Sequence, residues 1–165
     1  MNVFKPKAHF KRVSQIPFSL LMSWGIRSVF LDTDNTLAPR DSDAFTKDAL
    51  AWVEACKRAG FLLCIVSNGR PGRVKRASEK LGIPFVNPAL KPLSYGFKKA
   101  AHMMKVSPKQ CVMVGDQIFT DIWGGNNAGM KTILVEPVDP KSDGLWTKWI
   151  RRFEKRHLGP SPEGL

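Results

Sequence analysis

The chain has 165 residues, 43% of them hydrophobic and 24% charged, which suits one soluble domain with a substantial core. Lysine and arginine total 26 against 14 aspartates and glutamates, and the net charge of +12 favours anionic partners. The longest central apolar run, residues 61–66, is too short to cross a bilayer, which excludes it as a membrane span.

Apolar, strand-like runs alternate with helix-like segments along the chain. Strands are expected over residues 28–32, 61–67, 84–86, 111–115 and 131–135. Helices are expected from a cap at Ser42 or Asp43 to residue 57 or 58, over 71–82, over 94–104, and as a helix or helical loop over 118–128. Near-continuous apolar strands joined by helices predict a parallel sheet with helices on both faces, a single doubly wound (Rossmann-like) α/β domain.

Two aspartates, Asp32 and Asp34, directly follow the first predicted strand. Ionised carboxylates are rarely buried unless they are paired or bind metal, so a buried strand has no packing reason to end in two of them. They could form a polar site in which one attacks and the other moves a proton. The alternative is an ordinary β-turn, for which aspartate and asparagine are common.

Further polar clusters follow later strands. Ser67-Asn68-Gly69 ends the second strand, Lys91 follows the third, and Gly115-Asp116 ends the fourth, with Asp121 five residues on. Ligands of doubly wound sheets bind beyond the carboxyl ends of the strands. Four such clusters in order are hard to explain as turns, and together they predict one site.

The ordered set Asp32-x-Asp34-x-Thr36, Ser67, Lys91 and Gly115-Asp116-x4-Asp121 resembles the haloacid dehalogenase (HAD) superfamily of phosphohydrolases. The stretches 31–37, 66–68 and 114–121 are similar in particular to the YqeG-like branch, subclass IIIA, which is related to phosphatidylglycerophosphate phosphatases. The resemblance covers residues 26–137, most of the chain.

The resemblance implies roles for individual residues. Asp32 would be the nucleophile that forms an aspartyl-phosphate, and Asp34 the general acid and base. Ser67, Asn68 and Lys91 would bind the substrate phosphate, and Lys91 would also keep Asp32 ionised. An aspartate at position 34, where related pumps carry threonine, favours a phosphatase.

The resemblance also implies a Mg²⁺ cofactor, since Mg²⁺ prefers oxygen ligands and would relieve repulsion between carboxylates and phosphate. Its ligands would be Asp32, the backbone carbonyl of Asp34, and Asp116, with Asp121 as a further ligand or a supporting carboxylate. Among residues outside these motifs, Thr36 is expected to brace the loop, whereas Arg40 and Arg70 could grip anions or simply be surface arginines.

Spacing limits the substrate site, because family members carry cap domains between the first and second or the second and third motifs. Here 33 residues separate Asp34 from Ser67 and 24 separate Ser67 from Lys91, each enough for one helix and one strand. We therefore predict an uncapped domain over residues 28–158, preceded by a basic arm over 1–27 and followed by a flexible tail over 159–165.

The predicted helix over 144–157 places aromatic residues on one face and basic residues on the other. Such a helix can lie on anionic lipid or pack its aromatic stripe on the sheet, and the sequence leaves both open. The three cysteines, Cys56, Cys64 and Cys111, form no CxxC pair, which indicates reduced, buried thiols. With no signal-peptide pattern after the first lysines, we expect a cytoplasmic protein, peripheral at the inner membrane face if it binds lipid.

Three function classes follow. The first is a Mg²⁺-dependent phosphomonoesterase acting on phosphatidylglycerophosphate at a membrane surface. The second is a phosphatase of soluble phosphometabolites or nucleic-acid ends. The third is a non-catalytic, basic nucleic-acid-binding protein on the same scaffold, which is disfavoured because every catalytic motif position is present.

Overall fold

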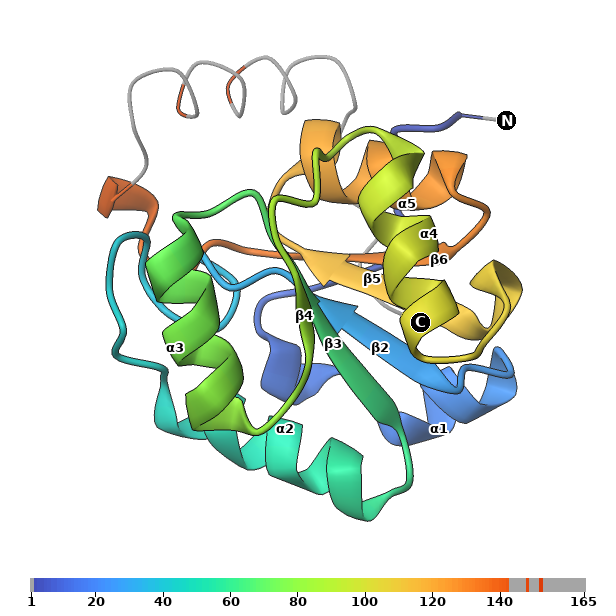
Figure 1. Ribbon diagram of the computed structural model, residues 1–165, viewed down its shortest axis with the longest axis horizontal. Coiled ribbons are helices and arrows are strands. Elements are labelled where there is room, and N and C mark those ends of the chain that lie inside the picture. The colour runs from blue at the N-terminus through green and yellow to red at the C-terminus, as the bar shows by residue number, and fades with distance from the viewer. Residues whose placement is uncertain (1, 143–147, 149–151, 153–165) are drawn as a thin grey trace.

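The computed structural model describes residues 2–142, 148 and 152. Within them, six parallel strands form one sheet in the order β1-β6-β5-β2-β3-β4 (Figure 1). The strands are β1 (Ala8–Phe10), β2 (Ser28–Leu31), β3 (Leu62–Val66), β4 (Phe85–Val86), β5 (Cys111–Gly115) and β6 (Lys131–Val135). The helices are α1 (Phe18–Ser23), α2 (Lys47–Arg58), α3 (Pro71–Leu81), α4 (Ser94–Met103) and α5 (Trp123–Asn127), with a π-helical turn η3 (Ile118–Ile122) before α5. The predicted parallel α/β sheet is confirmed.

Helices cover both faces of this sheet, and the alternation of side chains along β2 shows how. Val29 and Leu31 face a core that includes Trp52 of α2, whereas Phe30 faces the opposite core, which contains Phe97 of α4. Successive residues of a strand point to opposite faces, so a strand buried on both sides must be apolar throughout. All four residues of β2 are buried.

The start of α2 differs from the sequence prediction. We expected Ser42 or Asp43 to cap this helix, but it begins at Lys47, and the Thr46 hydroxyl accepts a hydrogen bond from the N–H of the third helical residue. Ser42 and Asp43 are instead held by an arginine of α3 through the Ser42 carbonyl and the Asp43 carboxylate. The contact with α3 takes the Asp43 carboxylate away from capping, whereas the Ser42 hydroxyl accepts a hydrogen bond from the Ala44 N–H at 3.1 Å in a local turn.

The segment over 118–128 is helical, and the pair Gly124-Gly125 that weakened its prediction has a packing role. A Cβ atom on Gly124 would lie 2.5 Å from a ring carbon of Phe97, and one on Gly125 would lie 2.7 Å from a methyl carbon of Thr132. Both distances are shorter than real contacts allow, so glycine lets α5 approach α4 and β6 closely.

The segment expected as a basic N-terminal arm contributes to the sheet. Within residues 1–27, β1 pairs with the edge strand β6, and the side chains of Val13, Ile16 and Leu21 are buried in the core. The predicted helix over 144–157, apart from positions 148 and 152, and the predicted tail over 159–165 lie outside the described residues. Among the helices that the structure describes, none has the length and apolar character needed to cross a bilayer.

The connections on either side of β3 are short. Between β2 and β3 the described chain forms α2 and loops, and between β3 and β4 it forms α3 and short turns. Neither connection contains a cap domain, as predicted from the motif spacing.

Candidate active site

The site lies where the strand order reverses. From β2 the chain proceeds outward through β3 and β4, and then returns to place β5 and β6 on the other side of β2. Asp32 directly follows β2 and Asp116 directly follows β5, and these two strands are neighbours with Leu31 opposite Val114. The N–H of Asp32 donates to the Val114 carbonyl oxygen at 3.1 Å, which fixes the start of the first motif against β5. This switch point is where doubly wound sheets bind ligands.

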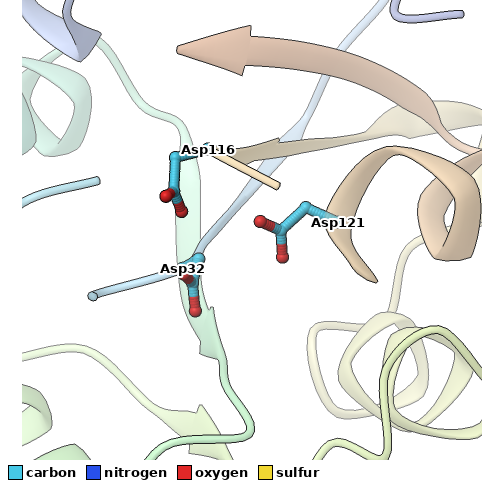
Figure 2. Close-up of side chains that lie close together, drawn as sticks. All are labelled: Asp32, Asp116 and Asp121. Atoms are coloured by element: carbon cyan, nitrogen blue, oxygen red, sulfur yellow. The ribbon is translucent and has the colours of Figure 1, made fainter. Parts of the chain in front are cut away.

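Three buried carboxylates meet at this point: Asp32, Asp116 and Asp121 each offer an oxygen within 4.8 Å of the others (Figure 2). Lys91 joins them, because its Nζ atom donates to Asp32 Oδ1 at 3.0 Å and to Asp121 Oδ1 at 2.6 Å. The Lys91 side chain is only 3% exposed. We call these four residues the inner cluster.

The position of Asp121 is set by its backbone surroundings. A Cβ atom on Gly115 would lie 2.2 Å from Asp121 Oδ2, so glycine at the end of β5 makes the space that this carboxylate fills. The N–H of Gln117 donates to the same oxygen at 3.1 Å, while Lys91 holds the other oxygen. Both Asp121 oxygens therefore have donors, which suits a carboxylate that orients Lys91.

Lys91 is positioned by Asn68, which ends the second motif. The Asn68 side-chain amide donates to the Lys91 carbonyl oxygen at 2.9 Å, and the Lys91 N–H donates to Asn68 Oδ1 at 3.0 Å. Two bonds in opposite directions fix the loop that carries the lysine. The predicted phosphate-binding role of Asn68 stays a prediction, and its side chain is committed to this loop.

Burial and charge act against each other in the inner cluster. Burial raises the pKa of Asp32, the nearby Lys91 ammonium opposes that rise, and Asp121 adds to it. Burial would lower the pKa of Lys91, but Asp121 and Asp32 outweigh burial and raise it above its ordinary value. Lys91 is therefore the cation that opposes the rise in the pKa of Asp32 caused by burial.

The donor set fits a hard divalent cation. Three carboxyl groups and one ammonium group are buried in one place, so the acidic groups outnumber the basic one. Buried charge without compensation is costly, and a divalent cation would balance it. Carboxylate oxygens are the ligands that Mg²⁺ prefers. Thr36, which was expected to brace the first-motif loop, contacts this group, and its hydroxyl donates to Asp116 Oδ1 at 3.3 Å.

Ser67 directly follows β3, and its side chain is buried and already accepts one hydrogen bond. Its hydroxyl oxygen accepts a hydrogen bond from the Gly69 N–H at 2.9 Å, which leaves the hydroxyl hydrogen to donate. A Cβ atom on Gly69 would lie 3.1 Å from Ser67 Oγ and 3.4 Å from Asp34 Oδ2. Glycine at this position therefore leaves room between the Ser67 hydroxyl and the Asp34 carboxylate.

Asp34 lies apart from the inner cluster. Its side chain is 16% exposed, and Oδ1 accepts a hydrogen bond from Arg73 Nη1 at 2.5 Å. Arg73, in the first turn of α3, also contacts Asp43, which in turn binds Arg76 through Nε at 2.8 Å. We call Asp34, Arg73, Asp43 and Arg76 the outer cluster.

The sequence prediction did not identify Arg73, although a signal was present. A positive charge in the first turn of a helix faces the positive end of the helix dipole and is unfavourable there. Arg73 is such a residue, two positions after the predicted N1 proline Pro71. Its placement indicates a carboxylate partner that compensates for the dipole, and Asp34 is that partner.

The structure thus divides the predicted site residues into two groups. Asp32, Asp116, Asp121 and Lys91 come together, whereas the Asp34 side chain faces Arg73. The predicted metal contact through the Asp34 backbone carbonyl stays a prediction, as do anion-binding roles for Arg40, which is half-buried, and Arg70, which is exposed. The three cysteines are free and buried, as expected, and burial raises the pKa of each thiol to about 12.

Comparison with known proteins agrees with this site. A family model described as haloacid dehalogenase-like hydrolase matches residues 25–129. The chain is 39% identical over 155 residues to "Probable phosphatase YqeG" of Bacillus subtilis, covering 94% of this chain and 90% of that protein. It is 26% identical over 158 residues to "Phosphatidylglycerophosphate phosphatase 1, chloroplastic/mitochondrial" of Arabidopsis thaliana, covering 90% of this chain and 45% of that longer protein.

A solved structure supports the fold. The crystal structure of an uncharacterized protein from Listeria monocytogenes serotype 4b has a TM-score of 0.57 and 23% sequence identity, covering 70% of this chain and 80% of that one. The family model spans most of the chain, including the residues of both clusters. The chain therefore belongs to the haloacid dehalogenase-like hydrolases and is a phosphatase of that family.

Proposed function

We propose that this phosphatase is a Mg²⁺-dependent phosphomonoesterase that works through an aspartyl-phosphate on Asp32, and that its substrate is phosphatidylglycerophosphate in an anionic bilayer. The observation that carries the mechanism is the inner cluster, in which a buried carboxylate at the switch point contacts a buried lysine. Phosphoryl transfer depends mainly on positioning and on neutralising charge, and this cluster provides both.

In the first step, an oxygen of Asp32 attacks phosphorus and the bond from phosphorus to the leaving alkoxy oxygen breaks. Asp34 gives its proton to that oxygen, so the product leaves as an alcohol. Ser67 donates its hydroxyl hydrogen to a phosphate oxygen, and Lys91 keeps Asp32 ionised for attack. When bound by Asp32 and Asp116, Mg²⁺ would supply positive charge against the repulsion between carboxylates and phosphate.

In the second step, Asp34 takes a proton from water as the water oxygen attacks phosphorus. The bond between phosphorus and Asp32 breaks, inorganic phosphate forms, and the Asp32 carboxylate is restored. Dividing the hydrolysis in this way replaces one difficult displacement by two easier ones. Asp34 ends the cycle protonated, ready for the next substrate.

Three observations support a lipid substrate. The first is the similarity over 90% of the chain to a plant phosphatidylglycerophosphate phosphatase. The second is the absence of a cap domain in the described connections around the site, which leaves room for a large substrate. The third is that residues 80–115, which include the Lys91 loop and α4, contain no acidic residue, so they do not repel an anionic surface.

The turn that carries Lys91 also exposes apolar side chains. Leu93 donates its N–H to the Leu90 carbonyl oxygen at 2.9 Å, and this turn leaves Leu90 48% and Leu93 63% exposed. Tyr95 follows at the start of α4 and is 54% exposed. The Lys99 ammonium lies over its ring, 5.9 Å from the ring centroid. Apolar residues beside lysines suit the surface of an anionic membrane.

The direct test is hydrolysis by the purified protein with Mg²⁺. Three substrates are compared at matched concentrations: phosphatidylglycerophosphate in anionic vesicles, glycerol 3-phosphate and a 3′-phosphorylated oligonucleotide. We expect the lipid to be hydrolysed with a much higher kcat/KM than either soluble phosphomonoester, and chelation of Mg²⁺ to stop the reaction. Preference for a soluble compound would refute the lipid substrate, and full activity in excess chelator would refute the metal requirement.

The membrane contact has its own control. Leu93→Asp should weaken binding to anionic vesicles and lower activity on the embedded lipid, while activity on a soluble phosphomonoester stays at the wild-type level. Met103→Asp alters an exposed apolar residue at the other end of α4 and should change neither. Equal effects of the two variants would show that the Lys91 turn is not the membrane-facing surface.

A further inference from the structure

Arg73 has more partners than a surface arginine requires. Besides its bond to Asp34, its Nη2 atom donates to the Ser42 carbonyl oxygen at 2.7 Å and its Nε atom donates to Asp43 Oδ1 at 3.4 Å. Asp41 lies 3.6 Å away as a further ion-pair partner. The Arg73 side chain is only 13% exposed. The guanidinium is planar and presents its donors in a fixed fork, so these contacts fix its orientation.

The contact with Asp34 holds one oxygen only. Arg73 binds Oδ1, while Oδ2 lies on the side of Gly69, where a Cβ atom would come within 3.4 Å of it. The same Cβ atom would come within 3.1 Å of Ser67 Oγ. Asp34 Oδ2 and the Ser67 hydroxyl therefore border the same space, which is the space that the proposed phosphate would enter.

We propose that Arg73 is a positioning residue that fixes the Asp34 side chain for proton transfer. This inference rests on the proposed role of Asp34 as general acid and base. With Oδ1 held by the guanidinium, Oδ2 is the oxygen that gives a proton to the leaving alkoxy oxygen and later takes one from the attacking water. A carboxylate that rotates freely would spend much of its time out of reach of both.

The alternative role for Arg73 is structural, because its bonds to Ser42 and Asp43 tie the loop before α2 to α3. The chain offers a matched control for this role. Arg76, one turn further along α3, binds Asp43 Oδ2 at 2.8 Å and ties the same loop to the same helix. Its described contact is with Asp43, so Arg76→Ala removes a loop contact and leaves the bond between Arg73 and Asp34 in place.

The test compares two leaving groups. The value of kcat/KM reports the steps up to departure of the first product, which here is transfer of the phosphoryl group to Asp32. An alkoxide is a poor leaving group and needs the proton from Asp34, whereas p-nitrophenolate leaves without one. The assay with Mg²⁺ compares wild-type protein with Arg73→Ala, Arg73→Lys and Arg76→Ala. The alkyl substrate is glycerol 3-phosphate, or phosphatidylglycerophosphate if its turnover is faster, and the aryl substrate is p-nitrophenyl phosphate.

We expect Arg73→Ala to lower kcat/KM for the alkyl substrate by about tenfold to a hundredfold, which is part of what general acid catalysis contributes. The value of kcat/KM for p-nitrophenyl phosphate should change by less than about threefold. Arg73→Lys, which keeps one charged donor, should lie between Arg73→Ala and wild type. Arg76→Ala should keep the wild-type ratio of the two substrates. Equal losses on both substrates in Arg73→Ala, or the same change of ratio in Arg76→Ala, would overturn the inference.

Two further results keep the outcome clear. Thermal unfolding identifies a variant that fails to fold. If Arg73→Ala is such a variant, the ratio of kcat/KM on the two substrates is measured in Arg73→Lys, and a wild-type ratio there overturns the inference. Asp34→Asn tests the proposed function separately. If Asp34→Asn keeps the wild-type ratio of the two substrates, the acid role of Asp34 fails; if it changes the ratio and the Arg73 variants do not, only the role of Arg73 fails.

Discussion

The two aspartates of the first motif are two residues apart in sequence and have opposite surroundings. Asp32 is buried in the inner cluster, where a lysine from the loop after β4 and an aspartate from η3 surround it. Asp34 is partly exposed in the outer cluster, where an arginine from α3 holds one of its oxygens. The two surroundings suit the two roles that we propose, because a nucleophile must be kept ionised and a proton carrier must reach substrate and water.

The two clusters also differ in how they are built. The inner cluster depends on the sheet, since β2 and β5 bring Asp32 and Asp116 together and Gly115 makes room for Asp121. The outer cluster depends on a loop and a helix, since Asp43 and Arg73 come from the segments on either side of β3. Damage to the inner cluster should therefore affect both chemistry and stability, whereas loss of Asp34 or Arg73 from the outer cluster should affect mainly the proton transfer.

The largest expected effect comes from the inner aspartate. Asp32→Asn should lower kcat by about a thousandfold or more on every accepted substrate, because the amide nearly matches the carboxylate in shape and lacks the attacking charge. Steady-state kinetics measures the loss, and an unchanged circular dichroism spectrum confirms the fold. Hydrolysis by this variant at the wild-type rate would refute the role of Asp32.

Lys91→Met tests the charge balance of the inner cluster. The swap keeps much of the volume and removes the ammonium that holds Asp32 and Asp121, so we expect the free energy of unfolding without Mg²⁺ to fall by about 3–5 kcal/mol. Added Mg²⁺ should restore part of it by binding the folded form. Denaturant titrations with and without Mg²⁺ measure both effects.

The control for Lys91→Met is Lys99→Met, which removes an exposed lysine of α4. It should leave the free energy of unfolding nearly unchanged, because exposed charges contribute little. Equal stability of the Lys91 variant and wild type in the absence of Mg²⁺ would contradict the charge balance that we infer for the inner cluster.

Gly69→Ala tests the space between the two clusters. The added methyl group would lie 3.1 Å from Ser67 Oγ and 3.4 Å from both Asp34 Oδ2 and a methyl carbon of Val74, so it would crowd the two groups proposed to act on the phosphate. We expect kcat/KM to fall by about tenfold to a hundredfold with little change in the melting temperature. Gly72→Ala is the matched control, because its methyl group meets only the flexible end of Arg76 at 3.5 Å. Similar activity of the two variants would show that phosphate binds elsewhere.

The smallest expected effect concerns Asp43 of the outer cluster. The hydrogen bond from Arg76 lowers the pKa of Asp43, and Arg73 adds to the effect. A carboxyl group whose pKa is lower in the folded state stabilises the fold at pH values above its unfolded pKa, which is near 3.8. This stabilisation is lost as the pH falls through the lower pKa of the folded state. Wild type should therefore melt slightly above Asp43→Asn at neutral pH, and this difference should shrink below pH 3.8. A difference that grows on acidification would contradict the sign.

Much of the inner cluster could be predicted from the sequence because its residues follow strands. Asp32, Lys91 and Asp116 each come after an apolar run, as does the neighbouring Ser67, and parallel strands bring their carboxyl ends to one edge. The partnership of Asp34 with Arg73 could not be predicted in this way, because it depends on how a loop folds against α3. The same loop explains the missed start of α2, where the Asp43 carboxylate binds α3 and the Ser42 hydroxyl binds the Ala44 N–H instead of capping α2.

One short strand escaped prediction, and one helical segment had only a weak local signal. The strand β1 has only three residues, and its contribution depends on pairing with the edge of the sheet at β6 rather than on its own hydrophobic pattern. The pair Gly124-Gly125 suggested a weak helix, and only the close approach to Phe97 and Thr132 explains it. In both cases the deciding interaction is tertiary, which a local pattern does not contain.

The central claim is that Asp32 carries the phosphoryl group and Asp34 serves as its proton carrier. The most direct measurement is mass spectrometry of Asp34→Asn after a brief reaction with substrate and Mg²⁺, quenched in acid to preserve the acyl phosphate. We predict a phosphoryl group on Asp32, because the first step still occurs slowly and the second step lacks its base. Substrate consumption without label on Asp32, or with label on another residue, would contradict the account.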